Sequence, residues 1–349
     1  MSKRGFSLVL AAAGIVALAA SGARAATCTA TGFYKDSINL TAALIATGDV
    51  TGRTIDSTGC NIGIFYGPGT SGKVDKVDVS NANYFGILVA GDIVDSSGND
   101  GSPGATSVDI INSNIHDIGE TPFNGDQHGN AIYYYAFAAG SSATGTVSRS
   151  DVFNYQKGGI IVNGPGSSVS ISDDTVTGLG PVDIIAANGI QFGFGASGKA
   201  MRNTVTGNSY TGENNASSTG ILVFGGCGYA LTTGIQIVKN TIGSTTPADG
   251  NDIGVALANY DPTCSTAPST ATNNKVVNNT ITNYETTNVS GDGYPNPYQA
   301  GISACGNNDK LIHNAISGIG YDPGSGTGFF AIDTDGCSTA AKIHANSTP

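Results

Sequence analysis

The chain has 349 residues, of which only 12% are charged, and it contains 51 glycines, no tryptophan and a formal net charge of −11. The chain is acidic overall and has few aromatic residues to interleave with its basic ones, whereas nucleic-acid binding requires both basic charge and such interleaving, so nucleic acid is not expected as a partner. Gly, Ser, Thr and Asn are abundant enough for disorder, but β-branched residues recur at regular places, which predicts a packed repeat.

Residues 1–26 have the pattern of an export signal. Two basic residues precede an apolar stretch over 6–20, and a small-x-small cleavage site follows at 23–25. The apolar stretch is short for a membrane span, and no second long apolar stretch follows it. We therefore expect a signal peptide over 1–26 that is cleaved near Ala25, a secreted or periplasmic protein, and no membrane insertion.

Six cysteines follow the export signal. An even number of cysteines in an exported chain indicates disulfide bonds, and six cysteines allow 15 pairings. None of them has the spacing of zinc ligands, and no Cys/His cluster is present, so the sequence predicts no metal site. The six are Cys28, Cys60, Cys227, Cys264, Cys305 and Cys337.

An irregular repeat begins near residue 108 and continues to the end of the chain. Its first half reads apolar-x-x-Asn-Thr-apolar, and after a loop its second half reads Gly-apolar-x-apolar. Copies begin 24 to 39 residues apart, which a β-solenoid tolerates because each coil keeps its short strands and varies one loop. Apolar positions alternate, so inward and outward side chains alternate along each strand. First halves begin at Ile110, Val147, Ile171, Ala200, Ile237, Val276 and Leu311, and second halves include 86–89, 159–162, 189–192, 220–223 and 301–304.

One polar position of the repeat forms a column of Asn and Asp residues. Stacked amide side chains can hydrogen-bond to one another and to the bent backbone from coil to coil. The column resembles the asparagine ladder of the pectin-lyase-like superfamily, over roughly residues 50–349. This resemblance implies an all-β, right-handed, single-stranded parallel β-helix of about 8–10 coils with an N-terminal cap. It also makes the Asp173–Asp174 pair structural, since Asp174 belongs to the column. The column contains Asp174, Asn203, Asn240, Asn279, Asn314 and Asn346.

The register of the coils sorts the cysteines. The resemblance places the Gly-apolar-x-apolar strand first in each coil and the strand before the ladder second. Four cysteines then follow the first strand in two pairs of adjacent coils, and the other two are left to tie the cap. The expected pairs are 28–60, 227–264 and 305–337. We divide the chain into a signal peptide (1–26), an N-terminal cap with the first coil (27–62) and a parallel β-helix (63–349).

The resemblance does not select an activity. The superfamily includes polysaccharide lyases, glycoside hydrolases, esterases, epimerases, tailspikes and non-catalytic adhesins, so function must be argued from the site. The Asn-Thr-Asp, Asp-Asp and Gly-His-Gly set of polygalacturonase-like hydrolases is missing. Asp261-Pro262 and Asp322-Pro323 stop short of the Asp-Pro-His-Asp of alginate-epimerase-like chains. No catalytic residues of a known branch carry over to this sequence.

The densest group of reactive side chains lies at 116–135. The alternation points Tyr134 inward and Tyr133 and Tyr135 outward, and polar residues of the next two coils fall at matching places. Such a face can move protons, hydrolyse a glycosidic bond with two carboxylates or stack aromatic rings on sugars without chemistry; the alternative is simple loop packing. The candidate catalytic residues are His128, Lys157, Tyr133, Asp126, His116 and Asp117, and the candidate substrate-binding residues are Tyr135, Gln156, Asn188 and Gln191.

Two functions remain open at this point. The first is a secreted polysaccharide-active enzyme, a lyase or glycoside hydrolase, that binds a glycan along the outer face of the first parallel sheet. The second is a non-catalytic, adhesin-like glycan-binding protein, which needs only the solenoid, the aromatic face and the disulfides. We expect a polysaccharide partner, a monomer and no cofactor. Calcium is kept as an alternative, because a cation would offset the repulsion between an acidic chain and an acidic glycan.

Overall fold

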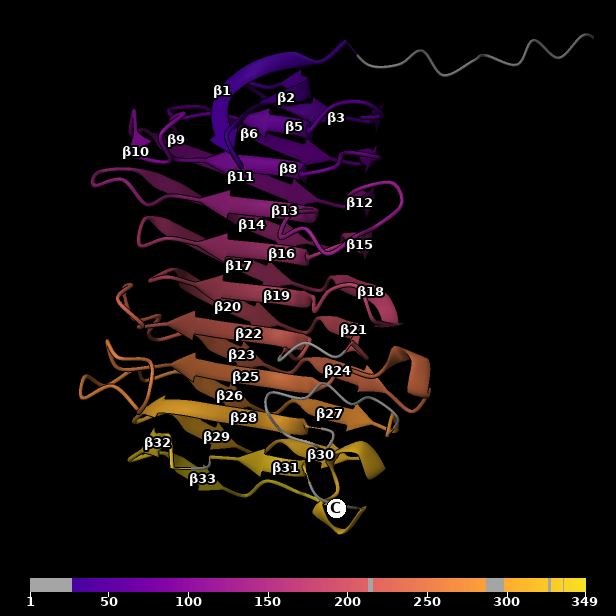
Figure 1. Ribbon diagram of the computed structural model, residues 1–349, viewed down its shortest axis with the longest axis vertical. Coiled ribbons are helices and arrows are strands. Elements are labelled where there is room, and N and C mark those ends of the chain that lie inside the picture. The colour runs from indigo at the N-terminus through magenta and orange to yellow at the C-terminus, as the bar shows by residue number, and fades with distance from the viewer. Residues whose placement is uncertain (1–26, 213–215, 287–297, 326–327, 335) are drawn as a thin grey trace, which may run out of the picture.

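The computed structural model of the protein describes residues 27–212, 216–286, 298–325, 328–334 and 336–349. The predicted signal peptide lies outside the described residues. Figure 1 shows one elongated stack of strands, with the described N-terminal end at the top and the C-terminus at the bottom. No helix in these ranges is long and apolar enough to cross a membrane.

Three sheets form the sides of the stack, and each coil contributes one strand to each sheet in turn. The first sheet contains β1 (Thr29–Lys35), β2 (Ile38–Ile45), β5 (Ile62–Tyr66), β8 (Phe85–Ala90), β13 (Asn130–Tyr135), β16 (Gly158–Asn163), β19 (Asn188–Gly193), β22 (Thr219–Gly225), β25 (Ile253–Asn259), β28 (Gln299–Asn307) and β31 (Phe329–Asp333), with β32 (Ser338–Thr339) beside β28. The second sheet contains β3 (Val50–Thr51), β6 (Ser71–Asp75), β11 (Ala105–Ile111), β14 (Ser142–Ser148), β17 (Ser167–Ser172), β20 (Ser197–Met201), β23 (Gln236–Val238), β26 (Lys275–Val277), β29 (Lys310–Ile312) and β33 (Lys342–His344).

The third sheet contains β4 (Thr54–Asp56), β7 (Asp78–Ser80), β12 (Asn114–Ile118), β15 (Asp151–Tyr155), β18 (Thr175–Val182), β21 (Thr204–Tyr210), β24 (Thr241–Ser244), β27 (Thr280–Asn283) and β30 (Ala315–Ser317). Outside these sheets lie the antiparallel ribbon of β9 (Ile93–Val94) and β10 (Asp100–Gly101) and the short 3₁₀ helices η1 (Pro247–Asp249), η2 (Ile319–Tyr321) and η3 (Pro323–Ser325). Within the described ranges the second sheet has ten strands. The predicted all-β parallel β-helix is therefore confirmed.

Columns of aliphatic side chains fill the interior. In the first sheet, one inward residue of each coil pairs in register with the next, and every member of this column is fully buried. Burying one such side chain contributes about 1.5–3 kcal/mol, so stacked coils supply the core that a single coil lacks. Glycine precedes every member of this column except Ile132, because space is short: a Cβ on Gly159 would lie 2.4 Å from the Gly189 carbonyl oxygen. The column is Ile64, Ile87, Ile132, Ile160, Ile190, Ile221, Val255 and Ile302.

The asparagine ladder forms as predicted. Asn203 Nδ2 donates to Asn240 Oδ1 at 3.1 Å, and Asn240 Oδ1 also accepts the Asn203 backbone N–H at 2.9 Å. The same pair of bonds joins Asn314 to Asn346 at the last coil. Asp174 continues the column, since its Oδ1 accepts the Ser150 N–H at 2.9 Å. These bonds satisfy backbone groups at the bend between the second and third sheets.

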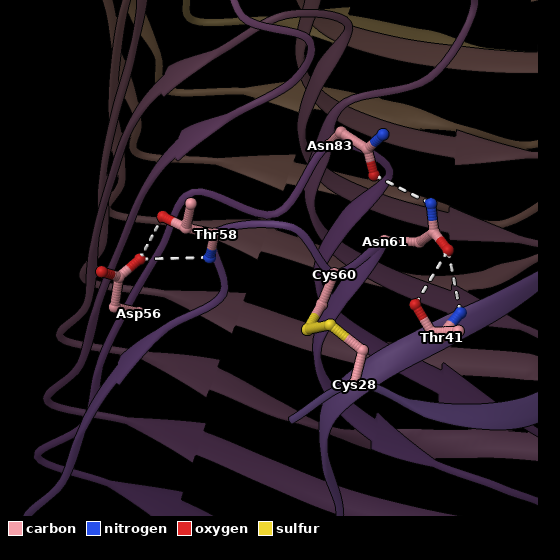
Figure 2. The surroundings of a disulfide bond; sticks show 7 residues. All are labelled: Cys28, Thr41, Asp56, Thr58, Cys60, Asn61 and Asn83. Carbon is pink, nitrogen blue, oxygen red and sulfur yellow. Dashed lines mark hydrogen bonds between the residues drawn. A yellow bond between two sulfur atoms is a disulfide. The ribbon is translucent and has the colours of Figure 1, made fainter. Parts of the chain in front are cut away.

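All three predicted disulfides are present, Cys28–Cys60, Cys227–Cys264 and Cys305–Cys337. The first of them fastens the N-terminal end, where β2 joins the first sheet in parallel with β5. Figure 2 shows that Asn61, the residue after Cys60, receives the Thr41 backbone N–H and donates to Asn83. The start of the chain is thus joined to the next two coils by a covalent bond and by side-chain hydrogen bonds.

The N-terminal hairpin, β1 and β2, is antiparallel. Its two-residue turn consists of Asp36 and Ser37, whose φ angles of 51° and 64° suit the turn type that matches the twist of paired strands. The hairpin does not simply extend the stack: Phe33 packs with Phe65 and Leu88 in a second apolar cluster on the outer face of the first sheet. Figure 1 shows β1 bending downward across the upper strands.

Candidate active groove

A groove of about 650 Å³ lies on the outer face of the first sheet. Its floor comes from β13, β16 and β19, where Tyr133, Ile161 and Gln191 are register partners on successive strands. A volume of this size is typical of sites for small molecules and short oligomers. The other floor residues are Asn130, Tyr135, Lys157, Asn163 and Asn188.

Two N-terminal segments wall one end and one side of the groove. The turn of the N-terminal hairpin contributes residues 33–37, and the loop of the β9–β10 ribbon contributes residues 94–98. Phe33 meets the edge of Tyr135, with ring centroids 5.3 Å apart. The Tyr135 hydroxyl in turn donates a hydrogen bond to Asp100 Oδ1 on the ribbon. The walls are therefore packed onto the floor.

A row of amide side chains crosses the floor from strand to strand. Asn188 Nδ2 donates to Gln191 Oε1 at 2.9 Å, and Gln191 Nε2 donates to Asn163 Oδ1 at 2.9 Å. Asn163 Nδ2 then donates to the Tyr133 hydroxyl oxygen at 3.1 Å. Each amide fixes its neighbour, so the row presents oriented dipoles and hydrogen-bonding groups to a bound molecule.

Lys157 is the cation of the floor. It immediately precedes β16, is half-buried, and donates from Nζ to the Ala186 carbonyl oxygen at 2.7 Å. Among the described residues it makes no salt bridge, because no carboxylate oxygen lies within 4.0 Å of Nζ. Burial lowers the pKa of Lys157 to about 8, since a low-dielectric site disfavours the charged ammonium.

The pKa of Tyr133 is shifted in the opposite direction. Burial raises the pKa of the Tyr133 phenol to about 12, against a smaller lowering by the hydrogen bond from Asn163. The ring stacks on Phe85 at 5.1 Å, which holds it flat on the floor. At neutral pH the groove therefore contains a phenol that keeps its proton and an amine that holds its proton less tightly than an exposed lysine does.

His128 is buried and does not line the groove. Only 4% of the residue is exposed, and its ring stacks on Tyr84 at 3.8 Å. Nε2 lies 2.8 Å from Glu120 Oε1, and Nδ1 lies 3.5 Å from Asp36 Oδ2 at the turn of the N-terminal hairpin. This arrangement makes His128 a clamp between the β12–β13 loop and the hairpin.

Gln156 is buried beneath the same loop. Its Oε1 accepts the backbone N–H groups of Glu120 and Asn124, both at 3.1 Å. Its Nε2 donates to the Asp126 carbonyl oxygen at 2.9 Å. All of these partners belong to the loop, so Gln156 shapes the β12–β13 connection and does not line the groove.

The remaining candidates from 116–135 lie apart from the groove. His116 is on β12 in the third sheet, where it stacks on Phe153 at 4.7 Å and bonds to Asp117 Oδ2 at 2.6 Å. Asp126 is exposed on the β12–β13 loop and accepts a bond from Asn124 Nδ2 at 2.9 Å. The structure thus brings together Tyr133, Tyr135, Lys157, Asn188 and Gln191 and separates the other five candidates from them.

One group of side chains has the composition of a cation site. Ligand atoms of Glu120, Asp126 and His128 all lie within 4.8 Å of one another. One imidazole and two carboxylates suit a transition-metal ion better than calcium, which prefers a shell of oxygens alone. The imidazole and Glu120 already satisfy each other through their 2.8 Å contact.

The sequence patterns did not predict several of the residues that line the groove. Asn163 pairs in register with Tyr135, so the outward alternation of 159–162 extended by one residue would have found it. The hairpin residues 33–37 carry no such signal, because the repeat begins after them and does not predict a strand that folds back over the sheet.

No protein-family model matches the chain, and no curated protein matches it. Among solved structures, a double mutant of the periplasmic alginate epimerase AlgG aligns with a TM-score of 0.38 and 12% sequence identity, covering 87% of this chain and 70% of that chain. The function is therefore inferred from the groove's own residues.

Proposed function

We propose that the protein is a polysaccharide lyase that cleaves a uronate-containing glycan in the groove by β-elimination. The observation that carries the proposal is Lys157, a half-buried amine with no salt bridge among the described residues and a pKa lowered to about 8, on the same floor as the protonated phenol of Tyr133. A base and an acid with separated pKa values in one groove suit removal of a proton next to a carboxylate.

The chemistry balances with these two side chains. Neutral Lys157 takes the proton from the sugar carbon next to the carboxylate, and the electron pair left behind forms a double bond to the neighbouring carbon. The glycosidic C–O bond at that carbon breaks, and Tyr133 gives its proton to the departing oxygen. The products are a chain with a new reducing end and a chain that ends in an unsaturated uronate. Proton transfer from Lys157 to Tyr133 through solvent then restores both side chains.

The amide row supports the substrate's carboxylate. Asn163, Gln191 and Asn188 hold one another in fixed orientation, and neutral donors of this kind can bind a carboxylate without the cost of desolvating an arginine. The second groove lysine, Lys35 of the hairpin, adds positive charge. These groups offset the acidity of the chain near the bound uronate.

Hydrolysis fits the groove less well. It requires two carboxyl groups facing the glycosidic bond, one of them protonated at the working pH. The carboxylates of the lining are Asp36 and Asp95, both on the wall. Backbone N–H groups, first that of Asn99, hold the pKa of Asp95 below its usual value, and Asp36 contacts His128. Neither has the environment of a general acid.

A location outside the cytosol belongs to the same proposal. Three disulfide bonds join all six cysteines of the chain. Such bonds persist in secreted and periplasmic proteins and are rare where thiols are kept reduced. An exported enzyme also meets polysaccharides directly.

The experiment is a screen of the purified protein against neutral and uronate-containing polysaccharides. Ultraviolet absorbance of unsaturated ends reports elimination, and a reducing-end assay reports any cleavage. We expect absorbance from a uronate polymer, a loss of at least a hundredfold in Lys157→Met and Tyr133→Phe, and no loss in the control Lys275→Met, on the second sheet. New reducing ends without absorbance would establish hydrolysis instead. Retention of a glycan without cleavage would establish the non-catalytic alternative.

A further inference from the structure

We propose that the N-terminal hairpin closes the groove at one end, so that the protein binds its glycan by a chain end and acts endwise. This inference rests on the proposed glycan substrate and adds a mode of binding to it. It follows from the exposure of one column of outward residues, from the contacts that hold the hairpin, and from a row of aromatic rings that leads away from it.

The outward column shows where the face is covered. Phe65, Leu88 and Tyr133 are register partners on β5, β8 and β13. Phe65 is 4% exposed and Leu88 is 0% exposed, although both point away from the interior of the coils, and Tyr133 is partly exposed. Ile161, the next partner in the column, is also 4% exposed, so the contacts of Phe65 and Leu88, and not their burial alone, locate the cover. The N-terminal hairpin and its apolar cluster cover the first two positions. A glycan that lies along the sheet therefore meets a wall at the β8–β13 step.

Several independent contacts hold this wall in place. The disulfide Cys28–Cys60 fastens the start of β1, as Figure 2 shows. At the other end of the strand, Asp36 at the turn lies 3.5 Å from His128 Nδ1. Phe33 between them packs on Tyr135. A strand fixed at both ends and in the middle is a permanent wall and not a mobile lid.

Aromatic rings mark the direction that remains open. Tyr135, Phe137 and Phe194 follow one another with centroids 4.8 Å and 5.9 Å apart. Phe194 meets Tyr229 at 4.9 Å, and Tyr229 is 60% exposed. Rings that succeed one another along a solenoid can stack on successive sugars. The row runs from the wall toward β22, which gives a bound chain one way out.

End-labelled oligosaccharides test the closed end without relying on catalysis. The probes are short oligomers of the glycan identified by cleavage or retention, with a bulky fluorophore on either the reducing or the non-reducing end, and the protein is the Lys157→Met variant. We expect one label to weaken binding at least tenfold and the other to change it less than twofold. Equal tolerance of both labels would overturn the closed end. That outcome is distinct from failure of the proposed lyase, in which no unsaturated product forms with the wild type.

Two sets of variants examine the wall and the exit separately. Tyr34→Ala shortens the wall and leaves the disulfide, Lys35 and Asp36 intact, so it should restore binding of the disfavoured label. Tyr229→Ala should weaken binding of long chains at least threefold and leave the shortest oligomer unaffected. The matched control is Tyr284→Ala, a 40% exposed ring that follows β27 of the third sheet. Unchanged label discrimination in the first variant, or equal loss for long and short chains in Tyr229→Ala, would contradict the arrangement.

Discussion

His128 Nδ1 lies 3.5 Å from Asp36 Oδ2, which joins a loop between two coils to the turn of a hairpin almost a hundred residues earlier. The same imidazole lies 2.8 Å from Glu120 through Nε2. His128 was the leading catalytic candidate from sequence, and its burial gives it instead the position of a structural clamp. The catalytic proposal therefore rests on two other candidates from the sequence, Lys157 and Tyr133, which lie on the floor of the groove.

Replacing His128 should loosen the hairpin more than it impairs the coils. In His128→Ala, Glu120 and Asp36 lose a common partner and Tyr84 loses a stacked ring, so we expect destabilisation of about 1–3 kcal/mol. Relative to the wild type, hydrogen–deuterium exchange in the variant should accelerate more in residues 29–45 than in β16 or β19. The control is His344→Ala, whose residue is exposed on β33. Uniformly faster exchange over all coils would contradict a local clamp.

The proposed lyase activity should rise with pH and reach a plateau above about pH 8. Lys157 acts as a base only without its proton, and burial lowers its pKa to about 8. Below that value the neutral fraction, and with it kcat/KM, grows about tenfold per pH unit. Tyr133, whose pKa burial raises to about 12, stays protonated throughout. A pH–rate profile that instead falls between pH 6 and 8 would exclude Lys157 as the base.

Asp174 should make the protein less stable as pH rises. Among the described residues its Oδ2 is buried without a hydrogen-bond partner, and burial raises the pKa of its carboxyl from 3.8 to about 7. The folded state therefore holds a proton that the unfolded state releases near pH 4. The free energy of unfolding contributed by this group falls between about pH 4 and 7 and is constant above that.

Asp174→Asn tests this dependence. Asparagine restores the ladder residue and should stabilise the protein above pH 7 by up to about 4 kcal/mol, at about 1.4 kcal/mol per pKa unit. Denaturant unfolding at pH 5 and pH 8 measures the difference. Asp173→Asn, which breaks an exposed pair with Arg202, should leave the slope between those pH values unchanged. The pKa values of Asp252 and Asp309 are also raised. Some loss of stability with rising pH therefore remains in Asp174→Asn. Equal stabilisation by Asp174→Asn at both pH values would contradict the argument.

Removing the first disulfide should open the closed end of the groove. The bond spans 32 residues, and the chain-entropy relation assigns such a loop about 3–4 kcal/mol. In Cys28→Ser with Cys60→Ser we expect cleavage by a protease within residues 27–45 while the coils from β13 onward remain folded. Cys305→Ser with Cys337→Ser provides the comparison at the opposite end, and an identical cleavage pattern in both variants would contradict a local effect.

The parts of the structure that repeat were predictable. The position of the ladder, the inward column of isoleucines and the pairing of the cysteines all follow from one register. Each coil must place the same residue types at the same bends. Tyr133 and Gln191 were also located by that register. The hairpin, the burial of His128 and the separation of His116 were not, since they depend on how single loops pack. Gln156 shows the limit most clearly: its position in the register is correct, but a loop covers it.

The central claim, elimination with Lys157 as the base, is tested most directly by degrading the glycan in water enriched in oxygen-18, the heavy isotope of oxygen. Mass spectrometry of the products reports whether water entered the broken bond. Elimination with Lys157 as base predicts unsaturated products without heavy oxygen, formed by the wild type and not by Lys157→Met. Saturated products that contain one heavy oxygen, or unchanged release by the variant, would contradict the account.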